Sequence, residues 1–393
     1  MKEVDVIFFV EHKDRELESV KLIASHLKKT GKKVLILSIF YHLNYLFKYK
    51  AKIFVFPYLL SKNDWPVSLL YKMYRDSAVY VNMNWEQLLA PVNLRYKKPK
   101  DDFTKKKVYQ FCWDESFKSF LIKNKVNEKN IIIGGNVANE LLYEMRNKRE
   151  DLRKNFSRKY HLDLNKKWLF LPMNYGWAFS GDSLIKRKIA DGYPEKEAWE
   201  YREYSKKCLD EFIVFVNELK NRFDYEIILR PHPSISEGDY KKVFKEKLGF
   251  IPEILINKDY SVREWIITSD IIGSSWSTSV GDAYNIGKKV FLFTPYKRPD
   301  WLDVWWKNEI INIKDINDFD EKKLSQKENV EFLNKKPSFI YSEFLASLET
   351  YPRLNFPKLT LKEWAKVLRS VWHNVKPPKN LIYDKFEAIK CNV

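Results

Sequence analysis

Cysteine is scarce in this chain of 393 residues, which contains only Cys112, Cys208 and Cys391. Their number is odd and their spacing is that of neither a zinc site nor a redox motif, so we expect ordinary thiols and no disulfide framework. No cluster of His or Cys has the spacing of metal ligands. The one Asp-x-Asp motif, Asp318-Phe319-Asp320, lies in a polar segment that we expect to be solvated surface. We therefore expect neither a bound metal nor a cofactor.

Long hydrophobic runs are absent as well. Charged residues interrupt every apolar segment well short of the roughly 20 residues that a membrane-spanning helix needs. Met1-Lys2-Glu3 leads directly into a strand-like segment without the pattern of a signal peptide, so we expect a cytoplasmic protein. Hydrophobic residues make up 45% of the chain, and its length favours two domains of roughly 150 to 200 residues each.

The charge is strongly unbalanced, with a formal net charge of +18 at pH 7. Such an excess indicates an anionic partner or a strongly solvated surface. The densest basic block, residues 95–107, interleaves lysines with aromatic residues and is suited to anionic lipid head groups. We therefore expect peripheral attachment to the inner face of the cytoplasmic membrane; a lysine-rich composition without any partner is the alternative. Nucleic acid is not expected, because no zinc-finger, RNP or helix-turn-helix signature accompanies the charge.

Strand-like and helix-like segments alternate along the chain, which is the pattern of a doubly wound α/β protein. The expected strands of the first half are 4–10, 34–39, 53–56, 79–81, 108–111 and 131–133. Those of the second half are 168–173, 225–229, 253–256, 270–273 and 289–293. A polar stretch separates the halves, so we predict domains at 1–150 and 165–355, followed by a helix and tail at 356–393 that brace both domains.

Two of these strand ends carry groups suited to holding phosphate. The strand at 225–229 continues into Arg230-Pro231-His232-Pro233, and the strand at 270–273 opens into the hydroxyl-rich segment 274–279 at the start of an expected helix. A guanidinium, an imidazole, hydroxyls and the N–H groups of a helix N-terminus all bind phosphate oxygens. Because the carboxyl ends of parallel strands share one edge of a sheet, these segments predict a nucleotide site.

Each element also has a purely structural interpretation. His232 between two prolines is compatible with a rigid turn that leaves the strand, and the hydroxyl residues are compatible with a helix N-cap. Asp282 lies one helical turn after Thr278, where it either binds ribose hydroxyls or lies on the helix surface. We favour the functional interpretation. The predicted nucleotide-binding residues are Arg230, His232, Pro233, Ser274, Ser275, Ser277, Thr278, Ser279 and Asp282.

The motifs at 230–233, 274–279, 281–283 and 287–290 resemble the C-terminal domain of bacterial surface-carbohydrate glycosyltransferases with a sialyltransferase-like GT-B fold. Segments 11–16, 84–87, 133–136 and 174–179 are similar to the upstream part of the same group. The resemblance spans roughly residues 4–295. It implies an α/β protein of GT-B type, with two doubly wound Rossmann-like domains that face a cleft.

The resemblance also implies a metal-independent glycosyltransferase that uses a CMP-activated donor. The implied sugar is 3-deoxy-octulosonate (Kdo) or a related nonulosonate, and the implied acceptor is a growing capsular polysaccharide or lipopolysaccharide. A donor with one phosphate needs less charge neutralisation than a diphosphate donor, so Arg230, His232 and the serine-rich loop suffice to stabilise the departing CMP. The alternatives are a CDP-glycerol-type polyol-phosphate transferase and a non-catalytic glycan-binding scaffold.

The catalytic base has several candidates. Glu11, Asp14 and Glu16 follow the first strand, and Glu86 lies in another loop at a strand end. Any of these carboxylates is suited to deprotonating an acceptor hydroxyl. The first three are equally compatible with acidic residues that stabilise a helix N-terminus. Four further residues are predicted to line the cleft, and for the tryptophan the hydrophobic core is the alternative: Asn136, Asn174, Tyr175 and Trp177.

Overall fold

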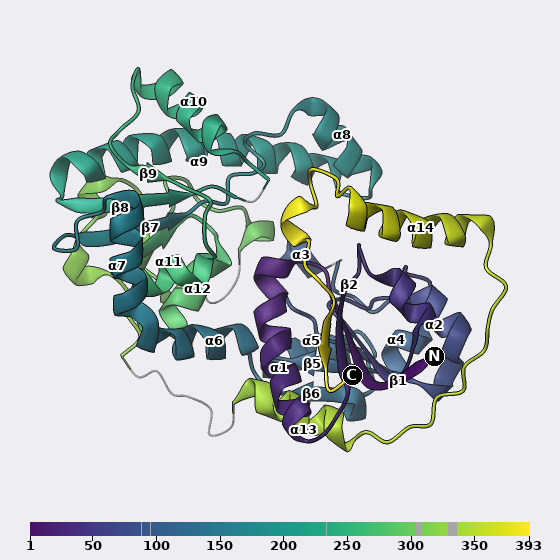
Figure 1. Cartoon of the computed structure of the whole chain (residues 1–393). Coiled ribbons are helices and arrows are strands. Elements are labelled where there is room, and N and C mark those ends of the chain that lie inside the picture. The colour runs from purple at the N-terminus through teal and green to yellow at the C-terminus, as the bar shows by residue number, and fades with distance from the viewer. Residues whose placement is uncertain (88, 95, 233, 304–307, 329–335) are drawn as a thin grey trace. The chain divides into compact units, whose positions relative to one another are not determined.

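The computed structural model describes the whole chain except residues 88, 95, 233, 304–307 and 329–335. The chain forms two compact units (Figure 1). Met1–Leu141 and Phe332–Val393 make up the first, which we call the N-terminal unit. Leu142–Glu331 make up the second, the C-terminal unit. Each unit is built around its own sheet, and the helices lie on both faces of it.

The sheet of the N-terminal unit has the strand order β13-β2-β1-β3-β4-β5-β6. All neighbouring strands in it are parallel except β13, which pairs antiparallel with β2. Its strands are β1 (Lys2–Val10), β2 (Val34–Ser38), β3 (Tyr49–Phe56), β4 (Val79–Asn82), β5 (Val108–Cys112), β6 (Ile131–Ile133) and β13 (Ile389–Cys391). Its helices are the π-helix η1 (Lys13–Leu17), the 3-10 helix η2 (Leu43–Phe47), α1 (Glu18–Lys29), α2 (Val67–Tyr74), α3 (Pro91–Leu94), α4 (Asp102–Lys106), α5 (Glu115–Lys123), α6 (Val137–Met145), α13 (Pro337–Ser347) and α14 (Leu361–Val375).

Successive side chains of β1 point to opposite faces of the sheet, so the strand contributes to both hydrophobic cores of this unit. Phe8 and Val10 pack on one face with α1 and α13, whereas Ile7 and Phe9 pack on the other face with α2. Parallel strands covered on both faces need apolar residues at nearly every position. This requirement explains why β1 appears in the sequence as an unbroken apolar run.

The sheet of the C-terminal unit has the order β12-β11-β10-β7-β8-β9, and all of its neighbouring strands are parallel. Its strands are β7 (Lys167–Pro172), β8 (Tyr225–Arg230), β9 (Leu255–Ile256), β10 (Ile271–Ser274), β11 (Lys289–Phe293) and β12 (Asn312–Ile313). Its helices are α7 (Arg149–Tyr160), α8 (Asp182–Ala190), α9 (Glu195–Arg222), α10 (Glu237–Leu248), α11 (Val262–Thr268) and α12 (Thr278–Asn285). The predicted α/β fold with two doubly wound sheets is confirmed.

The structure draws the domain boundaries differently from the prediction. The C-terminal unit begins at Leu142 and ends at Glu331, rather than spanning 165–355. Leu142 packs with Phe156 of α7, and Tyr341 of α13 stacks on Phe111 of β5 with ring centroids 4.1 Å apart. The tail at 356–393, predicted to brace both domains, is part of the N-terminal unit, where β13 extends the sheet. These contacts join residues that are far apart in the chain, which a local pattern does not reveal.

Candidate functional site

The predicted phosphate-binding segments lie at one edge of the C-terminal sheet. From β7 the chain adds β8 and β9 on one side and then β10, β11 and β12 on the other. Strands β7 and β10 are therefore neighbours whose connections run in opposite directions. In open α/β sheets, ligands bind outside the carboxyl ends of the strands at such a switch point.

The loop after β10 is tied to the loop after β7 by buried hydroxyls. Ser274 Oγ donates to the carbonyl of Pro172 at 2.6 Å, and Ser275 Oγ shares a hydrogen bond of 2.5 Å with the hydroxyl of Tyr175. All three side chains that take part are buried. The prediction that Tyr175 lines a cleft is therefore corrected, because it is a core residue. Ser274 and Ser275 were predicted to contact phosphate, but both are buried. Their hydroxyls instead connect the loop after β10 to the loop after β7.

Asn174 organises the start of α12. The side-chain amide of Asn174 is oriented with its oxygen toward the loop after β10, because the groups that face it there are N–H donors. It then accepts from Trp276 Nε1 at 2.7 Å and from the backbone N of Ser277 at 3.0 Å. Ser277 is the N-cap of α12 and accepts from Ser279 N at 3.3 Å. The hydroxyls of Ser277, Thr278 and Ser279 are partly or fully exposed at this helix N-terminus, which is electrostatically suited to an anion.

His232 lies beside the loop after β7. Its Nδ1 is 2.8 Å from Ser234 Oγ, which orients the ring. The loop after β7 contacts the loop after β8 at Gly176. A methyl group at Gly176 would lie 3.6 Å from His232 Nδ1 and 3.4 Å from Ser234 Oγ. Pro233, also predicted to bind the nucleotide, lies outside the described residues. The structure thus brings the histidine, the β7 loop and α12 to the same edge of the sheet.

A second basic residue accompanies Arg230. The Arg230 guanidinium donates to the carbonyl of Lys258, and Lys258 Nζ donates to the carbonyl of Ile235 at 3.0 Å. Burial, together with the charge of Arg230, lowers the pKa of Lys258. Lys258 was not among the predicted site residues. Its position directly beyond β9, at the shared carboxyl edge, is the signal that would have identified it.

Asp282 lies on α12 opposite a cation of the neighbouring helix. Burial raises the pKa of Asp282 to about 6, and the charge of Arg263 on α11 acts in the opposite direction. Trp177 stacks on Tyr201 of α9 with ring centroids 4.7 Å apart, and Lys188 Nζ lies 4.4 Å from its ring centroid. Trp177 is half-buried and belongs to an aromatic cluster with α8 and α9; it is not part of the hydrophobic core that was its alternative interpretation.

The N-terminal unit has a switch point of its own, because its sheet order places β2 and β3 on opposite sides of β1. Glu16 lies just beyond β1 on η1 and is fully buried. Glu16 Oε2 accepts from the backbone N of Glu11 at 2.8 Å. Glu16 Oε1 has no hydrogen-bond partner in the described part of the chain. Burial raises the pKa of Glu16 to about 7. The hydrogen bond from Glu11 N and the charge of Arg15 lower this pKa, but by less than burial raises it.

Glu86, the competing candidate from the loop after β4, is held in an ion pair with Arg15. Lys97 is buried beside them, with its Nζ 5.6 Å from the ring centroid of Tyr58. Burial lowers the pKa of Lys97 to about 8, and the charge of Glu86 acts in the opposite direction. Burial raises the pKa of Tyr58, and Glu86 adds to that shift. Lys97 and Tyr58 were not predicted.

The remaining predicted residues of this unit have local partners. Asp14 is exposed on η1. Asn136 accepts from the backbone N of Ala138 at 2.9 Å, at the start of α6. His12, next to Glu11, lies 3.5 Å from Asp384, and the hydrogen bond to Asp384 raises the pKa of His12. Of the four acidic candidates, Glu16 alone combines complete burial with a carboxylate oxygen that lacks a partner among the described residues.

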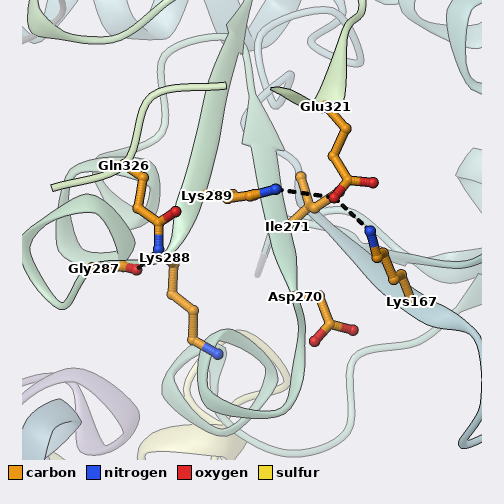
Figure 2. Close-up of a pocket in the computed structure, with 8 residues that line it drawn as sticks. All are labelled: Lys167, Asp270, Ile271, Gly287, Lys288, Lys289, Glu321 and Gln326. Atoms are coloured by element: carbon orange, nitrogen blue, oxygen red, sulfur yellow. Dashed lines mark hydrogen bonds and ion pairs between the residues drawn. The ribbon is translucent and has the colours of Figure 1, made fainter. Parts of the chain in front are cut away.

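A separate pocket lies at the opposite edge of the C-terminal sheet, at the amino ends of β7, β10 and β11. Figure 2 shows Glu321 in it between two lysines, Lys167 at 2.6 Å and Lys289 at 3.0 Å. Both lysines are paired with the same carboxylate, and the pocket holds none of the predicted site residues. Across the described ranges, His, Cys, Asp and Glu do not form a group of three or more that is suited to a metal ion.

No family model matches the chain, and no curated protein matches it in sequence. Solved structures do match. UDP-GlcNAc 2-epimerase from Methanocaldococcus jannaschii, in complex with UDP-GlcNAc and UDP, is 13% identical over 96% of this chain and 100% of that chain, with a TM-score of 0.51. The same enzyme from Neisseria meningitidis is 11% identical over 88% and 95%, with a TM-score of 0.49. The wall teichoic acid polymerase TagF is 12% identical over 97% and 86%, with a TM-score of 0.48.

At such identities a likeness shows the fold alone. The match to the Methanocaldococcus enzyme covers nearly the whole chain and confirms the predicted fold class, GT-B, with two Rossmann-like domains. The chemistry of this chain is therefore argued from its own residues. None of the helices in the described part of the chain has the length and apolar character needed to span a membrane.

Proposed function

We propose that this protein is a metal-independent glycosyltransferase that moves a sugar from a nucleotide-activated donor to a surface glycan. The observation that carries the proposal is the convergence of His232, Asn174 and the start of α12 at the switch point of the C-terminal sheet. An imidazole and a helix N-terminus at such a position are suited to the phosphate of a nucleotide. The resemblance to CMP-sugar transferases favours a CMP-linked Kdo or nonulosonate as donor.

The leaving nucleotide needs stabilisation of its phosphate, and this chain offers it without a metal. Arg230 and Lys258 supply positive charge at the ends of β8 and β9. The imidazole of His232 is suited to donating a hydrogen bond to the departing phosphate oxygen, while the hydroxyls at 277–279 and the N–H groups of α12 bind the others. Asp282, further along α12, is proposed to accept from the ribose hydroxyls.

The acceptor hydroxyl needs a base, and we assign that role to Glu16, whose buried carboxyl has an oxygen without a partner in the described part of the chain and has to become accessible when the acceptor binds. A general base works best when its pKa lies near the working pH, and burial raises the pKa of Glu16 to about 7. Glu86 is less suited because its carboxylate is already engaged in an ion pair with Arg15. Glu16→Gln should abolish sugar transfer and leave nucleotide affinity unchanged, because the substitution lies outside the unit proposed to bind the nucleotide. Transfer at the normal rate by this variant would remove Glu16 from the mechanism.

Nucleotide binding provides the direct test. Thermal unfolding of the full chain is measured with CMP, CMP-Kdo, CDP, CDP-glycerol, UDP and GDP. CMP and CMP-Kdo are expected to raise the Tm of the wild type, and the His232→Ala variant should lose that shift. His161→Asn is the matched control, since it removes a histidine of the same unit at a left-handed position that Asn tolerates.

Each other outcome of this test identifies an alternative. A shift with UDP or GDP alone would overturn the cytidine donor. A shift with CDP-glycerol, but not with CMP-Kdo, would favour polyol-phosphate transfer. A shift with CMP-Kdo without any CMP release, in the presence of membrane extract as acceptor source, would favour a glycan-binding scaffold.

A further inference from the structure

Helix α14 presents a continuous apolar surface to solvent. The side chains that form it are between 37% and 90% exposed, and we call them the α14 stripe: Leu361, Trp364, Leu368, Val371, Trp372 and Val375. At 3.6 residues per turn they fall within about 100° of the helix circumference. Single exposed apolar residues are ordinary on protein surfaces, but a contiguous strip with two tryptophans indicates an interaction site.

The other side of α14 is fixed to the N-terminal unit. Val367 and Ser370 are buried, and the backbone N of Leu43 on η2 donates to Ser370 Oγ at 3.2 Å. Glu363 forms an ion pair with Lys72 of α2 at 2.5 Å. A helix on a soluble protein usually buries its apolar face. Here Val367 is the buried apolar residue of the anchored face, and Trp364 is partly covered because it stacks on Phe47 of η2. The other side chains of the α14 stripe are left for another occupant.

Basic residues flank the α14 stripe. Lys362, Arg369 and Lys376 are exposed and occupy the next part of the helix circumference. Glu363 is the sole acidic residue of α14 and is paired with Lys72 on the anchored side. An exposed apolar face with tryptophans, bordered by lysine and arginine, is the pattern of a helix that lies in the interface of an anionic membrane.

We propose that the α14 stripe inserts into the head-group region of an anionic phospholipid membrane. The net charge of +18 complements such a surface. A second copy of the chain fits less well, because a two-fold contact through this helix would bring the basic flanks of both copies together. The proposal concerns a different surface from the nucleotide site and does not depend on the proposed reaction.

This proposal moves the expected membrane contact away from the basic block at 95–107. In that block Lys97 is buried, and Lys106 is paired with Asp102 at 2.8 Å. Asp101 caps α4 by accepting from Thr104 N. Arg95 lies outside the described residues. The block therefore offers fewer unpaired charges than its composition indicates, and its described residues, 96–107, form no exposed apolar stripe like that of α14.

Vesicle co-sedimentation of the full chain tests the proposal. The wild type is expected to bind phosphatidylglycerol vesicles, to bind less as salt increases, and to bind phosphatidylcholine vesicles weakly. The double variant Leu368→Glu/Trp372→Glu should bind at least tenfold more weakly. Both side chains are mostly exposed, so its Tm and its nucleotide-induced shift should match the wild type.

Two control variants sharpen the assay. Phe250→Glu/Ile251→Glu makes the same change at an exposed apolar pair of the C-terminal unit and should leave vesicle binding unchanged. Lys105→Gln/Lys107→Gln makes the same change of two charge units within the basic block and should reduce binding less than Leu368→Glu/Trp372→Glu does. Equal vesicle binding by the wild type and the α14 double variant would overturn the proposal. So would wild-type dimers that the double variant abolishes, because the stripe would then bind a second copy.

Discussion

Glu16 should make the stability of this protein fall as pH rises. The unfolded chain loses the proton of this carboxyl near pH 4.5, whereas the folded chain keeps it until about pH 7. The contribution of Glu16 to stability is therefore fully present below pH 4.5 and is lost progressively up to about pH 7. At 1.36 kcal/mol for each pH unit, the loss amounts to about 3 kcal/mol.

The variant Glu16→Gln isolates this effect. Gln has no charge at any pH and retains an oxygen that accepts from the backbone N of Glu11. Urea unfolding free energies of both proteins are measured from pH 4.5 to pH 8, and the wild-type value is subtracted from that of the variant. This difference should rise by about 3 kcal/mol across the range, because other titrating groups cancel.

A matched variant shows whether the effect depends on burial. Glu18→Gln removes a carboxylate on the adjacent helix, where Glu18 forms an exposed ion pair with Lys21. Its difference from the wild type should stay within about 1 kcal/mol at every pH, as for other exposed pairs. A Glu16→Gln difference that is equally flat would refute the conclusion that burial holds the proton on Glu16.

Three further predictions concern the C-terminal unit. His232→Ala should weaken nucleotide binding by about 1.5 to 3 kcal/mol, the contribution of a hydrogen bond to a charged group, in isothermal titration calorimetry; unchanged affinity would exclude the imidazole from the site. Gly273→Ala should lower the unfolding free energy by about 1 to 3 kcal/mol in urea titration, since a methyl group there would stand 2.1 Å from Cζ of Phe291; an unchanged midpoint would contradict this packing argument. Prolonged dialysis against EDTA should leave donor turnover intact, and activity that returns only with added Mg²⁺ or Mn²⁺ would contradict the metal-independent mechanism.

The sequence by itself identified the strands of both sheets. The expected strands 225–229 and 270–273 agree with β8 and β10 to within one residue at each end, because a parallel strand covered on both faces requires an apolar run. The edge strands β12 and β13 were missed, and β13 pairs with β2, which lies near the opposite end of the chain. The return of the chain through α13 was also missed, because it depends on long-range contacts such as that of Tyr341 with Phe111.

The sequence also predicted a candidate site, but the tertiary structure decided which side chains are exposed there. His232 and the segment 277–279 lie at the same edge of the C-terminal sheet, because the carboxyl ends of parallel strands share an edge. Burial of Ser274, Ser275 and Tyr175 followed only from packing between the β7 and β10 loops. Which of the four acidic candidates is buried was likewise undecidable from the chain, since desolvation arises from the tertiary surroundings of a side chain.

Helix α14 illustrates the same division. The sequence predicted a helix within 356–393, and the structure has one at Leu361–Val375. A periodic pattern assigns apolar and polar residues to different faces, but it does not say which face a neighbour covers. Here η2 and α2 hold the helix through Ser370 and Glu363, so Trp372 faces outward, while Trp364 lies at the edge of the exposed face and stacks on Phe47 of η2. Local sequence determined the helix, and only the tertiary contacts decided that its apolar side lies on the surface.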